Sequence, residues 1–87
     1  MKTIFTPEHN IFCQSMIAAR KTAKLTQAML AKSLNKPQSF VAKYERGERR
    51  LDVIEFLLVT RAIGINPSDI IQEVEKHLDQ ASCREKR

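Results

Sequence analysis

The fold is decided by residues 26–47, which read TQAMLAKSLNKPQSFVAKYERG. Thr26 is a hydroxyl residue of the kind that caps helices, and the apolar residues after it recur at helical spacing. Asn35 tolerates the left-handed conformation that ends many helices, and Pro37 suits the start of the next one. The stretch therefore predicts a helix-turn-helix, that is, two short helices joined by a tight turn, with the second helix over residues 37–46.

Further helix signals flank this stretch. Before it, the Thr-Pro pair at residues 6–7 begins a helix that we expect to reach about residue 24, with Ala23 among its inward positions. After it, Asp52 and Glu55 have the spacing of a capping box, and an apolar run follows them. A last helix begins with the Asn-Pro pair at residues 66–67.

The chain is short, and its charge changes along its length. Its 87 residues allow one domain, which we place at residues 1–81, with residues 82–87 as a frayed polar tail. Two glycines, no tryptophan and few β-branched runs favour an all-α domain of five helices. Residues 20–50 carry nine basic and two acidic side chains, whereas residues 51–81 carry two basic and six acidic ones. This segregation predicts one side that faces a polyanion.

Several classes of protein are disfavoured. No run of about 18 apolar residues exists, and the N-terminus lacks the apolar segment of a secretory signal, so we expect a cytoplasmic protein without a membrane contact. Cys13 and Cys83 are far apart and have no metal-ligand spacing, so we expect free thiols and no metal. The chain has no Ser/His/Asp set and no Gly-rich phosphate loop, so we expect neither an enzyme nor a cofactor.

The second helix of the predicted pair has an outward side that suits DNA bases. If Val41 and Tyr44 face the core, then Gln38, Ser39 and Lys43 lie on or near the opposite side. Gln can pair with N6 and N7 of adenine, and Lys can donate to O6 and N7 of guanine. Each residue taken alone is simply solvated. Together on one helix they are our candidates for reading bases.

Residues around this helix are candidates for phosphate contacts. Gln27 lies at a helix start, where a side-chain amide and the helix N-terminus can hold a phosphate. Phe40 packs either in or at the edge of the core, or against a sugar-phosphate strand or a thymine methyl. Tyr44 is expected in the core, with its hydroxyl reaching the surface. The basic candidates are Lys36, Arg46, Arg49 and Arg50, although the last two also suit an ordinary surface.

A longer set of motifs runs in order and without gaps through residues 12–71. Its members are Arg20-Lys21, Leu25-Thr26-Gln27, Leu30-Ala31, Leu34, Pro37-Gln38-Ser39-Phe40-Val41, Lys43-Tyr44-Glu45-Arg46-Gly47-Glu48-Arg49, Leu51-Asp52 and Ile63-Gly64-Ile65. This set resembles the Cro/C1-type helix-turn-helix (Xre-like) transcriptional regulators of bacteria and phages. The family often has an acid where Met29 stands and a Gly where Asn35 stands. The loss of the acid predicts a weaker cap at Thr26.

The resemblance implies a lambda-repressor-like domain that binds double-stranded DNA sequence-specifically, usually as a homodimer on a pseudo-palindromic operator. It implies that Gln27 holds a phosphate and that Gln38, Ser39 and Lys43 read bases. It also implies an ion pair between Arg20 and Glu45, which would fix the recognition helix. We therefore expect a bacterial or phage-encoded regulator, more often a repressor, that is nucleoid-associated when bound.

The last predicted helix offers a dimer interface. Ile70 and Ile71 are expected to close the core, while Val74 and Leu78 extend the stripe toward a second copy; core closure by all four is the alternative. A different class of function is also open, namely a protein-interaction module such as the antitoxin of a toxin–antitoxin pair. In that case this stripe carries the affinity. RNA binding is disfavoured because Phe40 has no neighbouring aromatic stacking platform.

Overall fold

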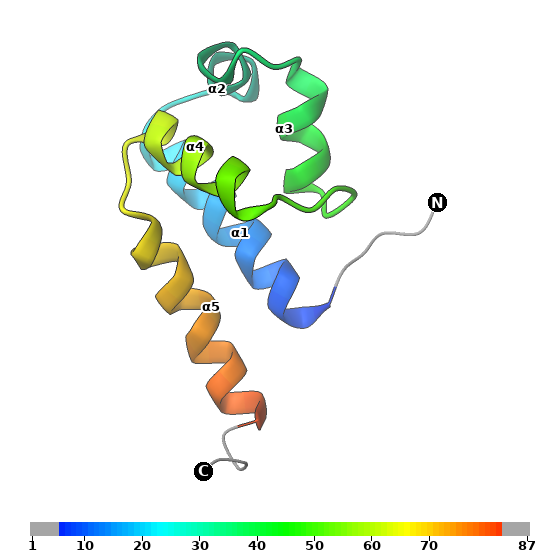
Figure 1. Ribbon diagram of the computed structural model, residues 1–87, viewed down its shortest axis with the longest axis vertical. Helices are drawn as coiled ribbons and strands as arrows, with labels where there is room; N and C mark the ends of the chain where they lie inside the picture. Colours follow the sequence, from blue (N-terminus) through cyan, green and yellow to red (C-terminus); the bar gives the residue numbers. More distant parts are fainter. Residues whose placement is uncertain (1–5, 83–87) are drawn as a thin grey trace.

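The computed structural model describes residues 6–82, with side chains described up to residue 78. It contains five helices, α1 (Pro7–Thr22), α2 (Gln27–Leu34), α3 (Gln38–Glu45), α4 (Val53–Ile63) and α5 (Pro67–Ser82), and the described part of the chain has no strand. In Figure 1, α2 and α3 lie at one end of the molecule and the C-terminal half of α5 at the other. The all-α prediction is confirmed. Of the predicted tail, Ser82 ends α5 and residues 83–87 lie outside the described residues.

The predicted helix-turn-helix consists of α2, a tight turn and α3. The Thr26 hydroxyl accepts a hydrogen bond from the backbone N–H of Met29 at 3.0 Å, so α2 keeps a side-chain cap without an acidic partner. Asn35 ends α2 in the left-handed conformation, at φ 60°. Immediately after it, the N–H of Lys36 donates to the carbonyl of Ala31 at 3.0 Å. The turn therefore follows from the residues that the sequence places there.

Two predicted boundaries move by one or two residues. Pro37 caps α3 in an extended conformation instead of opening it, so α3 begins at Gln38. The first helix ends two residues earlier than predicted, because Lys24 adopts a left-handed φ of 64° and cannot continue it. Ala23, predicted to face inward, is exposed as a result. The buried positions of α1 are instead Cys13, Met16 and Arg20.

The core draws on every helix. Its buried members are Met16, Leu30, Ala31, Val41, Tyr44, Phe56, Val59, Ile63 and Ile70. Tyr44 is completely buried, and the prediction that its hydroxyl reaches the surface is wrong: the oxygen is buried without a hydrogen-bond partner among the described residues. The backbone of Tyr44 lies against α1, where the Cys13 thiol donates to the carbonyl of Tyr44 at 3.3 Å. The side chain of Tyr44 therefore extends from a point that is already inside the core. Burial raises the pKa of Tyr44.

The start of α4 has the capping box that the sequence predicts. The Asp52 carboxylate accepts from the N–H of Glu55 at 2.7 Å, and the Glu55 carboxylate accepts from the N–H of Asp52 at 3.0 Å. At the other end, Gly64 ends the helix at φ 93°, a conformation that residues with a Cβ adopt rarely. Local signals thus determine both ends of α4.

The apolar stripe of α5 is only partly buried against α1. Ile70 is buried and closes the core, as predicted. Ile71 was predicted to do the same but is exposed, because it lies about 100° further around the helix. Val74 is half-buried and Leu78 is exposed. The stripe therefore closes the core at its start and turns toward solvent near its end.

Candidate nucleic-acid interface

The outward side of α3 brings the three predicted base readers together. Gln38 and Ser39 lie in the first turn, Lys43 lies one turn beyond Ser39, and all three residues are exposed. On the other side of the same helix, Val41 and Tyr44 fill the core. The major groove of B-DNA is wide enough to admit an α-helix, and recognition helices contact bases mainly through their first turns. This side of α3 can therefore present all three polar side chains to base edges.

A chain of hydrogen bonds connects the surface of α3 to the protein interior. The Gln38 amide donates to the Gln27 amide oxygen at 3.3 Å, and the Gln27 amide donates to Glu45 Oε1 at 2.9 Å. Glu45 in turn accepts from Arg20 Nε at 2.8 Å and from Arg20 Nη2 at 3.1 Å. Gln27, which the sequence suggested as a phosphate contact, is the middle link. The chain fixes which end of each amide points outward.

Arg20 and Glu45 form the ion pair that the family resemblance implied. The pair is bidentate and buried, and Arg20 Nη1 also donates to the carbonyl of Leu25 at 2.8 Å. The hydrogen bonds that Arg20 donates to Glu45 raise the pKa of Arg20 further above its ordinary value. Removing one partner would leave the other charge buried and unpaired, which costs far more than the pair contributes. The contact therefore fixes the end of α3 against α1.

Two further arginine–glutamate pairs involve the loop between α3 and α4, and the acid of one of them, Glu55, lies in the first turn of α4. Arg46 Nε donates to Glu48 at 2.9 Å and Arg46 Nη2 at 3.2 Å, on the surface. Arg49 donates to Glu55 at 2.9 Å and 2.7 Å and to the carbonyl of Arg50 at 2.9 Å. Hydrogen bonds from Arg49 and from the N–H of Asp52 lower the pKa of Glu55 to about 2. Arg49 therefore already has protein partners for much of its hydrogen-bonding capacity.

Two cations contact the ring of Phe40, which lies in the first turn of α3. The Arg49 guanidinium carbon is 4.8 Å and the Lys36 ammonium 5.4 Å from the centre of the ring, distances typical of cation–π contacts. On the inner side the ring meets Tyr44 edge-on at 5.7 Å. The core-edge interpretation of Phe40 is confirmed, because the half-buried ring packs on the core. Its contact with DNA stays a prediction.

Comparisons with known proteins agree with this geometry. The family model described as helix-turn-helix matches residues 16–70, from the middle of α1 to the start of α5. The chain belongs to the Cro/C1-type helix-turn-helix family. Among solved structures, it is similar to an XRE-family like protein from Pseudomonas syringae pv. tomato str. DC3000, with 41% sequence identity and a TM-score of 0.76 over 80% of this chain and 85% of that one. The search of curated proteins found no match.

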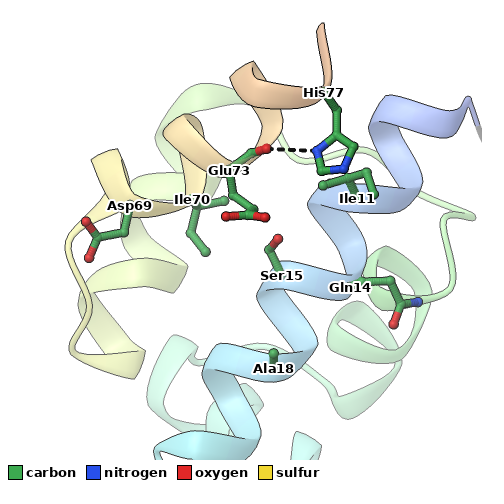
Figure 2. A pocket seen from close by; sticks show the side chains of 8 residues that line it. All are labelled: Ile11, Gln14, Ser15, Ala18, Asp69, Ile70, Glu73 and His77. Carbon is green, nitrogen blue, oxygen red and sulfur yellow. Dashed lines mark hydrogen bonds between the residues drawn. The ribbon is translucent and has the colours of Figure 1, made fainter. Parts of the chain in front are cut away.

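As a Cro/C1-type domain, the protein is a DNA-binding regulator of transcription. A shallow groove of about 570 Å³ on another side does not suit DNA. Figure 2 shows that α1 and α5 line it, with Asp69 and Glu73 as its charged side chains. His77 beside them directs Nδ1 toward the carbonyl of Glu73 at 3.1 Å. Two carboxylates with no lysine or arginine in the lining would repel a phosphate, so this groove is a poor surface for a polyanion.

The described part of this Cro/C1-type domain lacks two other kinds of site. Within residues 6–82, no group of three His, Cys, Asp or Glu residues is placed to hold a metal ion. No helix there is both long and apolar enough to cross a bilayer. Cys13 is a free thiol, as predicted. It is also buried, and burial raises its pKa, while Cys83 lies outside the described residues.

The sequence did not reveal the acidic residues that form ion pairs with the arginines of this region. Glu48 holds Arg46, and Glu55, expected only in the capping box, also holds Arg49. A spacing of two residues, as between Arg46 and Glu48, is no helical pairing signal, and the loop conformation creates the contact. The capping box was the one available hint for Glu55, because it places that carboxylate at the loop end of α4.

Proposed function

We propose that this protein is a transcriptional repressor that binds a pseudo-palindromic operator as a homodimer, with α3 as its recognition helix. The observation that carries the proposal is the outward side of α3, where Gln38 is exposed yet anchored through Gln27 to the buried Glu45. An amide held in place loses less conformational entropy when it meets a base. The protein would act in the cytoplasm without a catalytic step.

Each base reader has a proposed role. Because Gln38 already donates one amide proton to Gln27, its oxygen and its second amide proton remain for adenine N6 and N7. Lys43, one turn along, donates to guanine O6 and N7, and Ser39 serves as a short adaptable contact. Their spacing on α3 covers a few base pairs of one half-site.

The proposed phosphate contacts fall into two kinds. Lys36, Arg46 and Arg50 are exposed and would meet phosphates directly, with the N-terminus of α2 near Gln27 adding backbone N–H groups. Phe40 and Arg49 are engaged with each other, so we assign them to holding the loop and Lys36 in position. The directly contacting residues should account for most of the affinity and its salt dependence. The residues proposed for the phosphate side of the interface are Gln27, Lys36, Phe40, Arg46, Arg49 and Arg50.

A second copy is part of the proposal because one module of this size reads only a short half-site. Two copies on a two-fold operator would place their recognition helices about 34 Å apart, one turn of DNA. Val74 and Leu78 on α5 are one candidate contact for that copy, and the outward side of α4 is another.

Selection of duplexes from a random pool, followed by fluorescence-anisotropy titrations, tests the function. We expect the selected duplex to bind at least 10³-fold tighter than a scrambled one, the usual lower range for specific regulators. Lys43→Ala should relax the preference at one base position, whereas Arg46→Ala should weaken both duplexes alike and reduce the salt slope by about 0.9. Equal affinity of the wild-type protein for both duplexes would rule out sequence-specific regulation.

A further inference from the structure

A second groove, which we call the apolar groove, opens between the start of α1 and the later part of α5. Its volume is about 450 Å³, within the range of ligand pockets in proteins. In Figure 1, these parts of α1 and α5 lie at the end of the molecule away from α2. The loop between α3 and α4 borders the groove through Arg50. The apolar groove shares no lining residue with the groove of Figure 2.

Most of the surface of the apolar groove comes from hydrophobic side chains. They are Phe12 on α1 and three residues of α5, namely Ile71, Val74 and Leu78. Phe12 and Val74 are half-buried, whereas Ile71 is 51% exposed and Leu78 is 43% exposed. The ring of His9 stacks on Phe12 with centroids 5.8 Å apart, so part of the lining is aromatic. An occupant with an apolar body would remove these side chains from water.

Two carboxylates at the apolar groove have no ion-pair partner among the described residues. Glu8 lies in the first turn of α1 and Glu75 lies on α5, and both line the groove. Every other glutamate in the described part of the chain pairs with a basic residue: Glu45 with Arg20, Glu48 with Arg46, Glu55 with Arg49 and Glu73 with Lys76. The apolar groove therefore combines hydrophobic surface with acidic groups that lack a cation.

These features together favour an organic cation as the occupant. The lining contains two glutamates and a single arginine, Arg50, and no lysine. An apolar anion would meet both carboxylates, and a neutral apolar molecule would take water from them without giving a partner in return. A cation with an apolar body covers the hydrophobic side chains and pairs with the carboxylates at once.

A second copy of the chain is a poorer occupant of the apolar groove. A two-fold contact would place the groove against its own equivalent. Two concave surfaces would then face each other and leave space unfilled. Glu8 and Glu75 of one copy would also lie near the same carboxylates of the other.

We propose that the apolar groove binds an organic cation with a large apolar body, whose positive charge lies beside Glu8 and Glu75. The inference does not depend on how the protein reads DNA. It gives Val74 and Leu78 a different occupant from the second copy considered above. Because Arg50 borders the groove, a bound cation would lie next to a residue proposed to contact phosphate.

Two ions of the same shape and opposite charge test the proposal. Tetraphenylphosphonium is the cationic probe, and tetraphenylborate is its anionic counterpart. Each is titrated into the full-length protein while heteronuclear NMR follows the backbone amides of Phe12, Val74 and Leu78. At these amides we expect the cation to bind at least tenfold more tightly than the anion. The contrast is sharp because the chain has a net charge of +5, and unspecific attraction would favour the anion.

Matched substitutions locate the site. Glu8→Gln and Glu75→Gln should each weaken binding of the cation about threefold to fivefold, because each removes one charge interaction near the surface. Ile71→Ser should weaken it about fivefold through lost apolar contact. The controls are Glu73→Gln, in the groove of Figure 2, and Ile54→Ser, at an exposed position of α4, and both should bind the cation like the wild-type protein. Circular dichroism melting confirms that each variant is folded.

Several results would overturn the proposal. One is that the cation causes no shift of the three amides up to millimolar concentration, or that tetraphenylborate binds there as tightly. Another is a loss of cation binding in Glu73→Gln as large as in Glu75→Gln, which would indicate unspecific attraction to the acidic side of α5. A third is a wild-type dimer in sedimentation velocity whose formation protects these amides from the probe, because the occupant would then be a second copy.

Discussion

Two ion pairs at the end of α3 have almost the same geometry and very different surroundings. Glu45 pairs with Arg20 at 2.8 and 3.1 Å, and the next residue, Arg46, pairs with Glu48 at 2.9 and 3.2 Å. The side chains of the first pair are 10% and 4% exposed, whereas those of the second are 58% and 25% exposed. Two residues that are adjacent in the chain, Glu45 and Arg46, therefore form one ion pair in the interior and one at the solvent-exposed surface.

The comparison shows that burial and not distance sets what each pair does. In water, an arginine can exchange a carboxylate for a phosphate at little cost, so Arg46 is available to DNA. In the interior neither Arg20 nor Glu45 can lose its partner without leaving a desolvated charge. The buried pair fixes α3, and the exposed pair supplies an exchangeable charge beside it.

Breaking the buried pair should have the largest effect. We expect Arg20→Ala to lower the free energy of unfolding by about 3–5 kcal/mol, because Glu45 would stay buried without its partner. Urea denaturation followed by circular dichroism measures the loss. Arg46→Ala is the matched control and should leave the urea midpoint nearly unchanged.

A double substitution sharpens this result. Arg20→Met with Glu45→Leu removes both charges and should recover much of the stability that Arg20→Ala loses. If Arg20→Ala and Arg46→Ala shift the urea midpoint equally, burial does not distinguish the two pairs.

The pair between Arg49 and Glu55 is intermediate, and acid should weaken it. Because the pKa of Glu55 is about 2 in the folded state and near 4.5 otherwise, its stabilising contribution is present above pH 4.5 and is lost as the pH falls toward 2. Glu55→Gln should cost about 1 kcal/mol at pH 7, including the weakened capping box. Denaturation at pH 7 and pH 2.5 should show this difference shrinking with acid. Glu75→Gln, at an exposed position of α5, is the matched control.

A buried polar group without a partner should behave in the opposite way to the buried ion pair. Tyr44→Phe removes a hydroxyl that makes no hydrogen bond among the described residues. We expect stability to stay the same or to rise by up to about 1 kcal/mol, since no hydrogen bond is lost. Thermal melting measures the change, and a clear drop in Tm would mean that the hydroxyl has a water partner.

The exposed pair should show the smallest effect on stability and a visible effect on DNA. Arg46 lowers the pKa of Glu48, so the carboxylate is charged at neutral pH and opposes a phosphate near Arg46. Glu48→Gln should leave Tm unchanged, tighten binding to selected and scrambled duplexes alike, and steepen the salt slope by up to about 0.9. Anisotropy titrations at several salt concentrations measure this. A change in base preference would instead assign Glu48 a reading role.

The sequence predicted the elements of this fold well because their boundaries depend on local chemistry. The Thr26 cap, the left-handed Asn35 and the Asp52–Glu55 capping box are each determined within four residues, and all three are confirmed. Periodicity was less informative where apolar residues surround a helix. The apolar residues of α4 fit more than one possible inward side, so the sequence alone could not show that Ile54 and Leu58 are exposed.

The side-chain partners of the candidate site were harder to predict. The direction of the Gln27 amide depends on Glu45, which is 18 residues away, and no spacing in the sequence encodes that contact. Likewise, Arg49 is a plain basic residue in the sequence, and only the loop conformation places it over Phe40 and against Glu55. Base-reading candidates were easier to choose, because they follow from which side of one helix is left outside.

The burial of Tyr44 has a practical consequence for spectroscopy. It is the one tyrosine of a chain without tryptophan, so ultraviolet absorbance and emission near 300 nm report on a single phenol at the inner side of α3. Because burial also keeps that phenol protonated, the tyrosinate signal in alkali should emerge together with unfolding. The native chain thus contains its own optical reporter for whether α3 is packed against the core.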